Sequence, residues 1–293
     1  MQRIKSLLAL VGALTLVVLG FMSVRACDDD ADSDANFGPG PLPATSTTAT
    51  SGSPTLDKIK LRKRLVVSMP RDRPGLSTPG PDGQLAGFDV EIARIIATGL
   101  ELAPDAVSFK PVPPSTVAAA LGSGDVDLAL GGFVSGASDL ELAGPYLATS
   151  VDVLVPAGSP AAGLDTLDGP VCAITGTGDA AALRAKVPGL RVNEVAGAKQ
   201  CLTQLRASLA KGIVADDGVL RGLAAAEPGG YRLLGARLAD QSYGVGLPAG
   251  DAVLRGKITE ILAAAGDDGS WQSAYDRTLG GSGVTAAAPP VQR

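Results

Sequence analysis

Short apolar runs alternate with amphipathic segments between residues 56 and 279, and this alternation most constrains the fold of the chain. Residues 64–69, 126–130 and 151–155 have the length and composition of buried strands. Between such runs, residues 88–97 repeat apolar side chains at helical spacing. Strands that alternate with helices form mostly parallel sheets covered by helices. The sequence therefore predicts an α/β fold, in which ligands bind beyond the carboxyl ends of strands and at helix N-termini.

The composition excludes several classes of function. The chain contains no histidine, which excludes mechanisms that need an imidazole as a base, triad member or metal ligand. The formal net charge is −5, from 25 basic and 30 acidic residues, so we expect no nucleic-acid partner. No pair of acid and base groups stands out in the sequence.

The N-terminal 55 residues indicate export. Arg3 and Lys5 precede an apolar run over residues 7–22, which is shorter than the about 20 residues of a membrane span and typical of a signal peptide. Val24-Arg25-Ala26-Cys27 resembles a bacterial lipobox, although the charge of Arg25 departs from the pattern. We expect a lipoprotein signal peptide over residues 1–26 and lipidation of Cys27. An uncleaved anchor helix and an ordinary exported precursor are the alternatives.

Two further segments have the composition of disordered chain. Residues 27–55 are first acidic and then rich in Gly, Pro, Ser and Thr, so they cannot bury a core and are expected to form a tether. Residues 281–293 are rich in Gly, Ala and Pro and are expected to form a flexible tail.

The two remaining cysteines lie in segments that could pack together. Cys172 belongs to the apolar run 171–174, and Cys201 lies on the apolar face of an expected helix over residues 199–209. A strand packed on a helix can bring two sulfurs together, and the compartment outside the cytoplasm favours their oxidation. We expect a disulfide between Cys172 and Cys201. The alternative is two buried thiols.

Several motifs occur in the order found in one protein family. Gly87-Phe88-Asp89-Val90-Glu91-Ile92-Ala93 resembles the signature of the family 3 extracellular solute-binding proteins, the amino-acid receptors of ABC importers. Further matches follow in order at residues 124–128, 144–147, 164–169, 175–178, 216, 243–247 and 268–271. Arg73-Pro74-Gly75-Leu76, the paired cysteines and the lipoprotein start are most similar to the glutamate and glutamine receptors of actinobacteria.

The resemblance implies a two-lobed periplasmic-binding-protein fold of type II. The first lobe would comprise residues 56–150 and 244–280, and the second lobe residues 151–243. Two hinge strands, near 148–154 and 243–247, would cross between the lobes. The implied function is a monomeric, lipid-anchored receptor on the outer face of the cell membrane, which is not an enzyme and uses no metal and no cofactor. It would deliver a small polar solute, an amino acid of the glutamate or glutamine type, to ABC permease subunits.

The resemblance also implies a ligand site for the two charged ends of an amino acid. Asp216 would hold the ammonium, Thr177 and Gly178 at a helix N-terminus would bind the carboxylate, and Gly131, Gly132 and Phe133 would supply backbone groups and an apolar wall. Three of these residues have a plainer alternative: Asp216 and Thr177 are also suitable helix caps, and Phe133 is also suitable for a core.

One departure from the family pattern concerns the group that binds the α-carboxylate. The arginine that binds the α-carboxylate would fall between Gly136 and Asp139, where no basic residue occurs, and no Lys or Arg lies between residues 111 and 183. A neutral residue does not replace a bidentate arginine. Arg71 or Arg73 in the first ligand-facing loop is the candidate substitute, and the alternative is a solvated loop charge.

Three other functions compete with transport. Residues 176–181 read as G-x-G-x-x-A, the pattern of a dinucleotide-binding turn, with Glu194 as the ribose ligand. The position in mid-chain of an exported protein argues against a nucleotide enzyme. A dehydratase built on the binding-protein fold lacks an evident acid–base pair. The stronger alternative, favoured by the missing arginine, is a sensor or scaffold lipoprotein with a degenerate or different ligand site.

Overall fold

The computed structural model describes residues 51–134 and 140–291. In this part of the chain the main sheet has the order β4-β1-β5-β11-β6-β9-β7-β8, and β10 pairs with β6. Its strands are β1 (Leu65–Ser68), β4 (Val107–Lys110), β5 (Leu128–Val134), β6 (Glu141–Pro156), β7 (Val171–Ile174), β8 (Val192–Val195), β9 (Gly212–Asp216), β10 (Tyr231–Leu233) and β11 (Ala239–Leu247). A separate ladder pairs β2 (Thr78–Pro79) with β3 (Leu85–Ala86).

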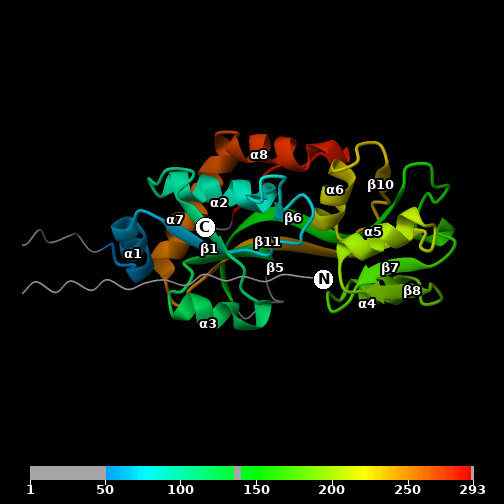
Figure 1. The fold of residues 1–293 in the computed structure, drawn as a ribbon, viewed down its shortest axis with the longest axis horizontal. Helices are drawn as coiled ribbons and strands as arrows, with labels where there is room; N and C mark the ends of the chain where they lie inside the picture. Colours follow the sequence, from blue (N-terminus) through cyan, green and yellow to red (C-terminus); the bar gives the residue numbers. More distant parts are fainter. Residues whose placement is uncertain (1–50, 135–139, 292–293) are drawn as a thin grey trace, which may run out of the picture. The chain divides into compact units, whose positions relative to one another are not determined.

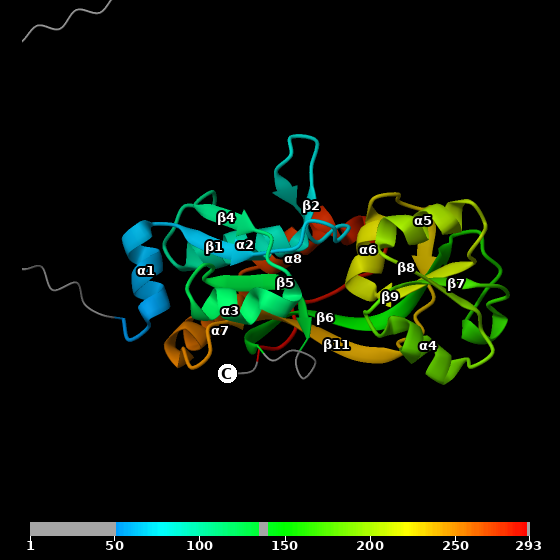
Figure 2. The ribbon, with the colours of Figure 1, turned by 60° about the horizontal axis from the view of Figure 1, so that its bottom comes forward.

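Two groups of parallel strands are joined by two long strands. β1 is parallel to β4 and β5, and β7 is parallel to β8 and β9. β6 and β11 are antiparallel to each other and run from one group to the other (Figure 1, Figure 2). β6 continues beyond β11 to pair with β9. We call the part around β1 the first lobe and the part around β7 the second lobe. The prediction of an α/β, two-lobed binding-protein fold with two hinge strands is confirmed.

Helices cover both faces of each group because alternate strand residues point to opposite faces. In the first lobe, Leu128 and Leu130 pack with α2, whereas Ala129 packs with α3. In the second lobe, Cys172 faces α5 and α6, whereas Ala173 faces α4. The helices are α1 (Pro54–Arg62), α2 (Phe88–Gly99), α3 (Val117–Gly122), α4 (Asp179–Lys186), α5 (Ala198–Arg206), α6 (Asp217–Ala225), α7 (Ala252–Asp267) and α8 (Ser270–Thr278).

The few large aromatic side chains gather in the core of the first lobe. The Phe88 ring meets the Trp271 ring edge-on with centroids 5.5 Å apart, and Trp271 stacks on Tyr275. The Trp271 indole N–H donates to the Tyr146 carbonyl at 2.7 Å, so its polar atom is satisfied inside the core. Tyr146 in turn donates to Asp89 at 2.9 Å. This cluster joins α2, β6 and α8, which are distant in sequence.

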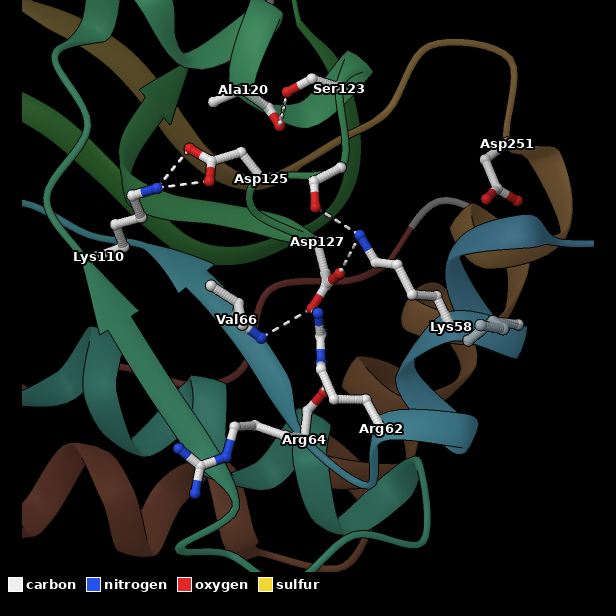
Figure 3. A network of polar contacts seen from close by, with 12 residues as sticks. Lys58, Arg62, Arg64, Val66, Lys110, Ala120, Ser123, Asp125, Asp127 and Asp251 are labelled. Atoms are coloured by element: carbon white, nitrogen blue, oxygen red, sulfur yellow. Dashed lines mark hydrogen bonds and ion pairs between the residues drawn. The ribbon is translucent and has the colours of Figure 1, made fainter. Parts of the chain in front are cut away.

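A buried aspartate fastens α1 to the first lobe (Figure 3). The Asp127 side chain is fully buried just before β5, and it accepts from Arg62 and from the Val66 amide, the latter at 2.7 Å. Lys58 lies 3.2 Å from the other oxygen of Asp127 and donates to the Gly124 carbonyl at 2.5 Å. Lys58 and Arg62 are four residues apart and therefore share one helix face.

The predicted disulfide is confirmed. Cys172 in β7 and Cys201 in α5 are both fully buried and their sulfurs are bonded, closing a sequence separation of 29 residues. The bridge fixes α5 against the sheet of the second lobe.

The predictions for the two ends of the chain compare differently with the structure. The predicted signal peptide, Cys27 and most of the tether lie outside the described residues. Ser53, predicted to belong to the tether, instead caps α1 by accepting from the Leu56 amide at 3.1 Å. The segment after residue 281, predicted to be flexible, packs on the core in this structure through Ala286, Ala288 and Val291. Within residues 51–134 and 140–291, no helix is long and apolar enough to cross a membrane.

Candidate functional site

A cavity of about 530 Å³ lies at the carboxyl ends of strands from both lobes. This is the position where α/β folds place ligands, since the loops that leave parallel strands converge there. The first lobe contributes the segment after β1 and the end of β5. The second lobe contributes the turn before α4, the turn before α5 and the end of β9. The hinge strand β11 contributes Gln241 and Tyr243.

The structure brings most of the predicted ligand residues together. The cavity is lined by Arg73, Gly131, Gly132, Phe133, Thr177 and Asp216. Gly178 lies next to the lining and is the left-handed N-cap of α4. Arg71 is not part of the cavity, because its side chain is exposed and donates to the Gly83 carbonyl at 3.4 Å. The loop segment 135–139, where the family arginine would fall, lies outside the described residues.

Arg73 provides the positive charge of the cavity. Its guanidinium donates to the Tyr243 hydroxyl and lies 4.8 Å from the centre of the Tyr243 ring. Burial acts to lower the pKa of Arg73, but the opposing effects of Tyr243, Asp89 and Asp216 outweigh it and raise the pKa. The side chain therefore stays charged. Among the described residues that line the cavity, no other lysine or arginine occurs.

Gly132 makes room for this guanidinium. The residue has a φ of 85°, and a Cβ placed there would lie 1.9 Å from an Arg73 nitrogen. Any side chain at this position would displace Arg73. Both the backbone conformation and the lack of space therefore require a glycine at this position.

Asp216 is a helix cap, as its plainer alternative predicted, and it also lines the cavity. It ends β9 and caps α6, because its Oδ1 accepts from the Gly218 amide at 2.8 Å. The same oxygen accepts from the Tyr243 hydroxyl, which links Asp216 to Arg73 through one tyrosine. Both bonds use Oδ1, so Oδ2 is the oxygen that could meet a ligand ammonium.

The Thr177 side chain forms its hydrogen bonds within its own turn, before α4. Its hydroxyl donates to the Ile174 carbonyl at 3.0 Å and accepts from the Asp179 amide at 3.4 Å. The residue is exposed, so it can offer its backbone amide to a ligand without losing these bonds. The G-x-G-x-x-A segment thus forms one wall of this cavity at the start of α4.

The sequence did not reveal Asp179 and Tyr243 as cavity residues. Asp179 begins α4 and is only 4% exposed, yet it lines the cavity. Burial, with a further contribution from the Asp216 charge, raises the pKa of Asp179 to about 6. An aspartate directly after the Gly-rich turn was the available signal, but it is equally typical of an ordinary helix start. Tyr243 lies in an apolar strand and gave no signal.

The neighbouring Asp217 lies outside the cavity lining. Its carboxylate accepts from Arg221 at 2.6 Å and from the Ser150 hydroxyl at 3.2 Å, and both hydrogen bonds are buried. Burial raises the pKa of Asp217 to about 6, although Arg221 opposes the shift. This pair holds α6 beside the hinge strand β6.

Comparison with known proteins identifies the class. The ABC transporter glutamine-binding protein of Bacillus subtilis is 25% identical over 232 residues, covering 77% of this chain and 84% of the relative. The glutamate-binding protein of Corynebacterium efficiens is 25% identical over 228 residues, covering 71% of this chain and 76% of the relative. Such relatives are transport receptors, so the prediction that the chain is not an enzyme is confirmed, and the dinucleotide interpretation of residues 176–181 is wrong.

Solved structures share the fold. An ancestral cationic amino acid solute-binding protein matches with a TM-score of 0.69 at 21% identity, over 77% of this chain and 99% of that one. The cysteine-binding protein of Campylobacter jejuni matches with a TM-score of 0.62 at 22% identity, over 77% of this chain and 92% of that one. The profile of the bacterial extracellular solute-binding proteins, family 3, matches residues 65–281. The chain belongs to this family, as its motifs predicted.

Proposed function

We propose that the protein is a lipid-anchored, extracytoplasmic receptor that binds a polar amino acid of the glutamate or glutamine type and delivers it to an ABC importer. The observation that carries the proposal is one cavity in which a charged arginine faces two carboxylates across the lobes. A free amino acid presents a carboxylate and an ammonium, which are the complements of these groups. The relatives named above support the ligand type.

Each end of the ligand has a partner in this proposal. Arg73 takes the α-carboxylate in place of the family arginine, helped by backbone amides near Gly132 and Thr177. Asp216 accepts from the ammonium, and Asp179 lies close enough to add negative charge. The ammonium meets Oδ2 of Asp216 while Oδ1 keeps its contact with Tyr243, so little charge is left unpaired in either state.

Thermal shift and calorimetry test the proposal on the mature lipoprotein in detergent with a panel of the twenty amino acids. We expect a clear rise in melting temperature with glutamine, glutamate or a close analogue, and loss of binding in Asp216→Ala. Asp165→Asn, an exposed aspartate in the second lobe, is the matched control and should bind as the parent does. Flat melting curves across the panel would contradict the proposal.

A sensor or scaffold lipoprotein is the second candidate. The observation that favours it is that Arg73 and Asp216 are already connected through Tyr243, so the charges of the cavity are satisfied within the protein. In that case amino acids would not shift the melting temperature. The protein would instead be retained by a membrane protein other than an ABC permease in a reconstituted pull-down.

A further inference from the structure

Basic residues are concentrated in one short segment of an acidic protein. Residues 58–64 contain Lys58, Lys60, Arg62, Lys63 and Arg64 and no acidic residue, whereas the whole chain has a net charge of −5. This segment comprises the end of α1 and the turn that leads into β1. Such a concentration at one place creates a local positive field that the net charge conceals.

The structure divides these cations into two sets. Lys58 and Arg62 turn inward and share an ion pair with the buried Asp127, as Figure 3 shows. Lys60, Lys63 and Arg64 are exposed, and Arg64 points away from Asp127 and donates to the Ser108 hydroxyl at 2.9 Å. Among the described residues, no carboxylate forms an ion pair with any of these three cations. Three positive charges therefore face solvent.

A large apolar side chain lies among these exposed cations. Leu61 is 88% exposed, whereas Leu56 and Ile59 of the same helix are buried in the core of the first lobe. Single exposed leucines are common on protein surfaces. A leucine flanked by exposed lysines and arginines, however, combines the positive charge and the apolar side chain through which segments bind at the surface of anionic membranes. We define the α1 face as Lys60, Leu61, Lys63 and Arg64.

We propose that the α1 face binds the anionic headgroups of the membrane and that Leu61 enters the lipid interface. The partner follows from chain continuity. α1 begins at Pro54, only 27 residues after Cys27, and an acyl chain on Cys27 or an uncleaved 7–22 segment would hold the membrane nearby. A flexible chain of that length has a mean span of roughly 25–30 Å. This inference rests on the membrane anchorage in the proposed function.

Electrostatics favours this contact once the anchor has brought the surfaces together. Anionic lipids give the membrane a negative potential that attracts basic segments within about one Debye length, or about 8 Å at physiological salt. A basic patch is a recognised second signal that acts together with a lipid anchor. Figure 1 and Figure 2 place α1 at the end of the first lobe away from β7 and β8. Contact through α1 would therefore leave the second lobe free.

The experiment uses the full-length lipoprotein reconstituted in vesicles that contain brominated lipids. Leu61→Trp places an indole on the α1 face, and the single native tryptophan, Trp271, is only 1% exposed and contributes little quenching. We expect strong quenching in phosphatidylcholine vesicles that contain phosphatidylglycerol. Quenching should fall several-fold in pure phosphatidylcholine or at high salt. Adding Lys60→Glu, Lys63→Glu and Arg64→Glu should abolish it without changing the melting temperature.

Leu209→Trp is the matched control, because Leu209 is 64% exposed on the second lobe and should not be quenched. Equal quenching at both positions, or quenching that ignores lipid charge, would overturn the proposal. So would unquenched fluorescence at position 61 in both vesicle types. Protection of α1 from hydrogen exchange only when permease is added would assign the face to a protein instead. Flotation with the vesicles distinguishes failure of the α1 contact from failure of the membrane anchorage in the proposed function, because a protein that does not float has lost the anchorage itself.

Discussion

At the scale of single residues, Arg73 carries the proposed binding of the α-carboxylate. We predict that Arg73→Ala weakens amino-acid binding by about 100-fold, because a charge-assisted, bidentate contact is lost. Arg73→Lys should recover only part of the affinity, since an ammonium cannot make the planar paired contact. Calorimetry with the best ligand of the panel measures both. Arg71→Ala is the control, and an equal loss there would show that the cavity does not bind the carboxylate through Arg73.

Asp179 gives a pH dependence that is also a property of one residue. Its pKa is raised from 3.8 to about 6, first by burial and then by the Asp216 charge. The folded state therefore binds more protons than the unfolded state between these values. The stability contributed by protonated Asp179 is full below pH 3.8 and is lost as the pH rises through 6. The upper limit of this loss is about 3 kcal/mol.

We predict that Asp179→Asn reduces the fall in unfolding free energy between pH 4 and pH 7 in the ligand-free protein. Chemical denaturation at a series of pH values measures the effect as the difference from the parent. Asp217 remains in both proteins and contributes a decline over the same range, because burial raises its pKa to about 6 as well. Parallel curves for variant and parent would show that Asp179 titrates normally.

At the scale of elements, the disulfide fixes α5 on the sheet of the second lobe. In the chain-entropy model, closing a loop of this length stabilises the folded state by about 3–4 kcal/mol. We predict that Cys172→Ala combined with Cys201→Ala lowers the unfolding free energy by about this amount. Chemical denaturation of the detergent-solubilised protein measures it. Cys27→Ser is the control, and it should alter membrane attachment while leaving the unfolding of the domain unchanged.

The attachment of α1 depends on one buried charge. We predict that Asp127→Ala lowers the unfolding free energy by about 1–3 kcal/mol, because the buried Val66 amide loses its acceptor and the partly exposed Lys58 and Arg62 lose their ion pairs. Asp125→Asn is a matched control two residues away, since its pair with Lys110 is exposed and should contribute less than about 1 kcal/mol. A small effect at Asp127 would mean that water replaces the carboxylate and that α1 is held by Leu56 and Ile59 alone.

The sequence predicted elements whose pattern is local and missed those fixed by tertiary contacts. The expected helix 88–97 and strand 171–174 correspond to α2 and β7, because burial imposes a clear period on each. The expected strand 151–155 is only the end of β6, which starts at Glu141. Its first part contains Gly144 and Pro145, which are unusual in a strand interior. No helix was predicted over residues 56–62, because the polar residues of α1 serve Asp127 and do not border a helical apolar stripe.

In the candidate site, too, local motifs were predicted from the sequence and features fixed by tertiary contacts were not. Motif order placed Gly131, Gly132, Thr177 and Asp216 at one cavity, because each lies in or just after the carboxyl-terminal part of a strand whose end faces the cavity. The choice between Arg71 and Arg73 could not be made from the sequence, since the turn that directs one inward and the other outward depends on the Arg73–Ser77 bridge.

At the scale of the whole molecule, the charged groups of the cavity belong to different lobes. Arg73 lies on the first lobe, Asp216 on the second, and Tyr243 on the hinge strand between them. A ligand that binds Arg73 and Asp216 together must bridge the lobes, so its affinity depends on how the lobes meet. The segment that carries Arg73 is also where the lobes touch, because a Cβ on Gly222 of α6 would lie 1.9 Å from the Pro74 carbonyl oxygen.

We therefore predict that Gly222→Ala weakens amino-acid binding by about tenfold, because the added methyl must separate α6 from the segment that positions Arg73. Titration calorimetry measures the affinity, and small-angle scattering with and without ligand follows the closure of the lobes. Gly256→Ala in α7 is the matched control, since no atom lies within 4 Å of its added Cβ. That change should raise the unfolding free energy by about 0.5–1 kcal/mol and leave binding unchanged. Unaltered affinity in Gly222→Ala would show that this contact between the lobes does not govern the position of Arg73.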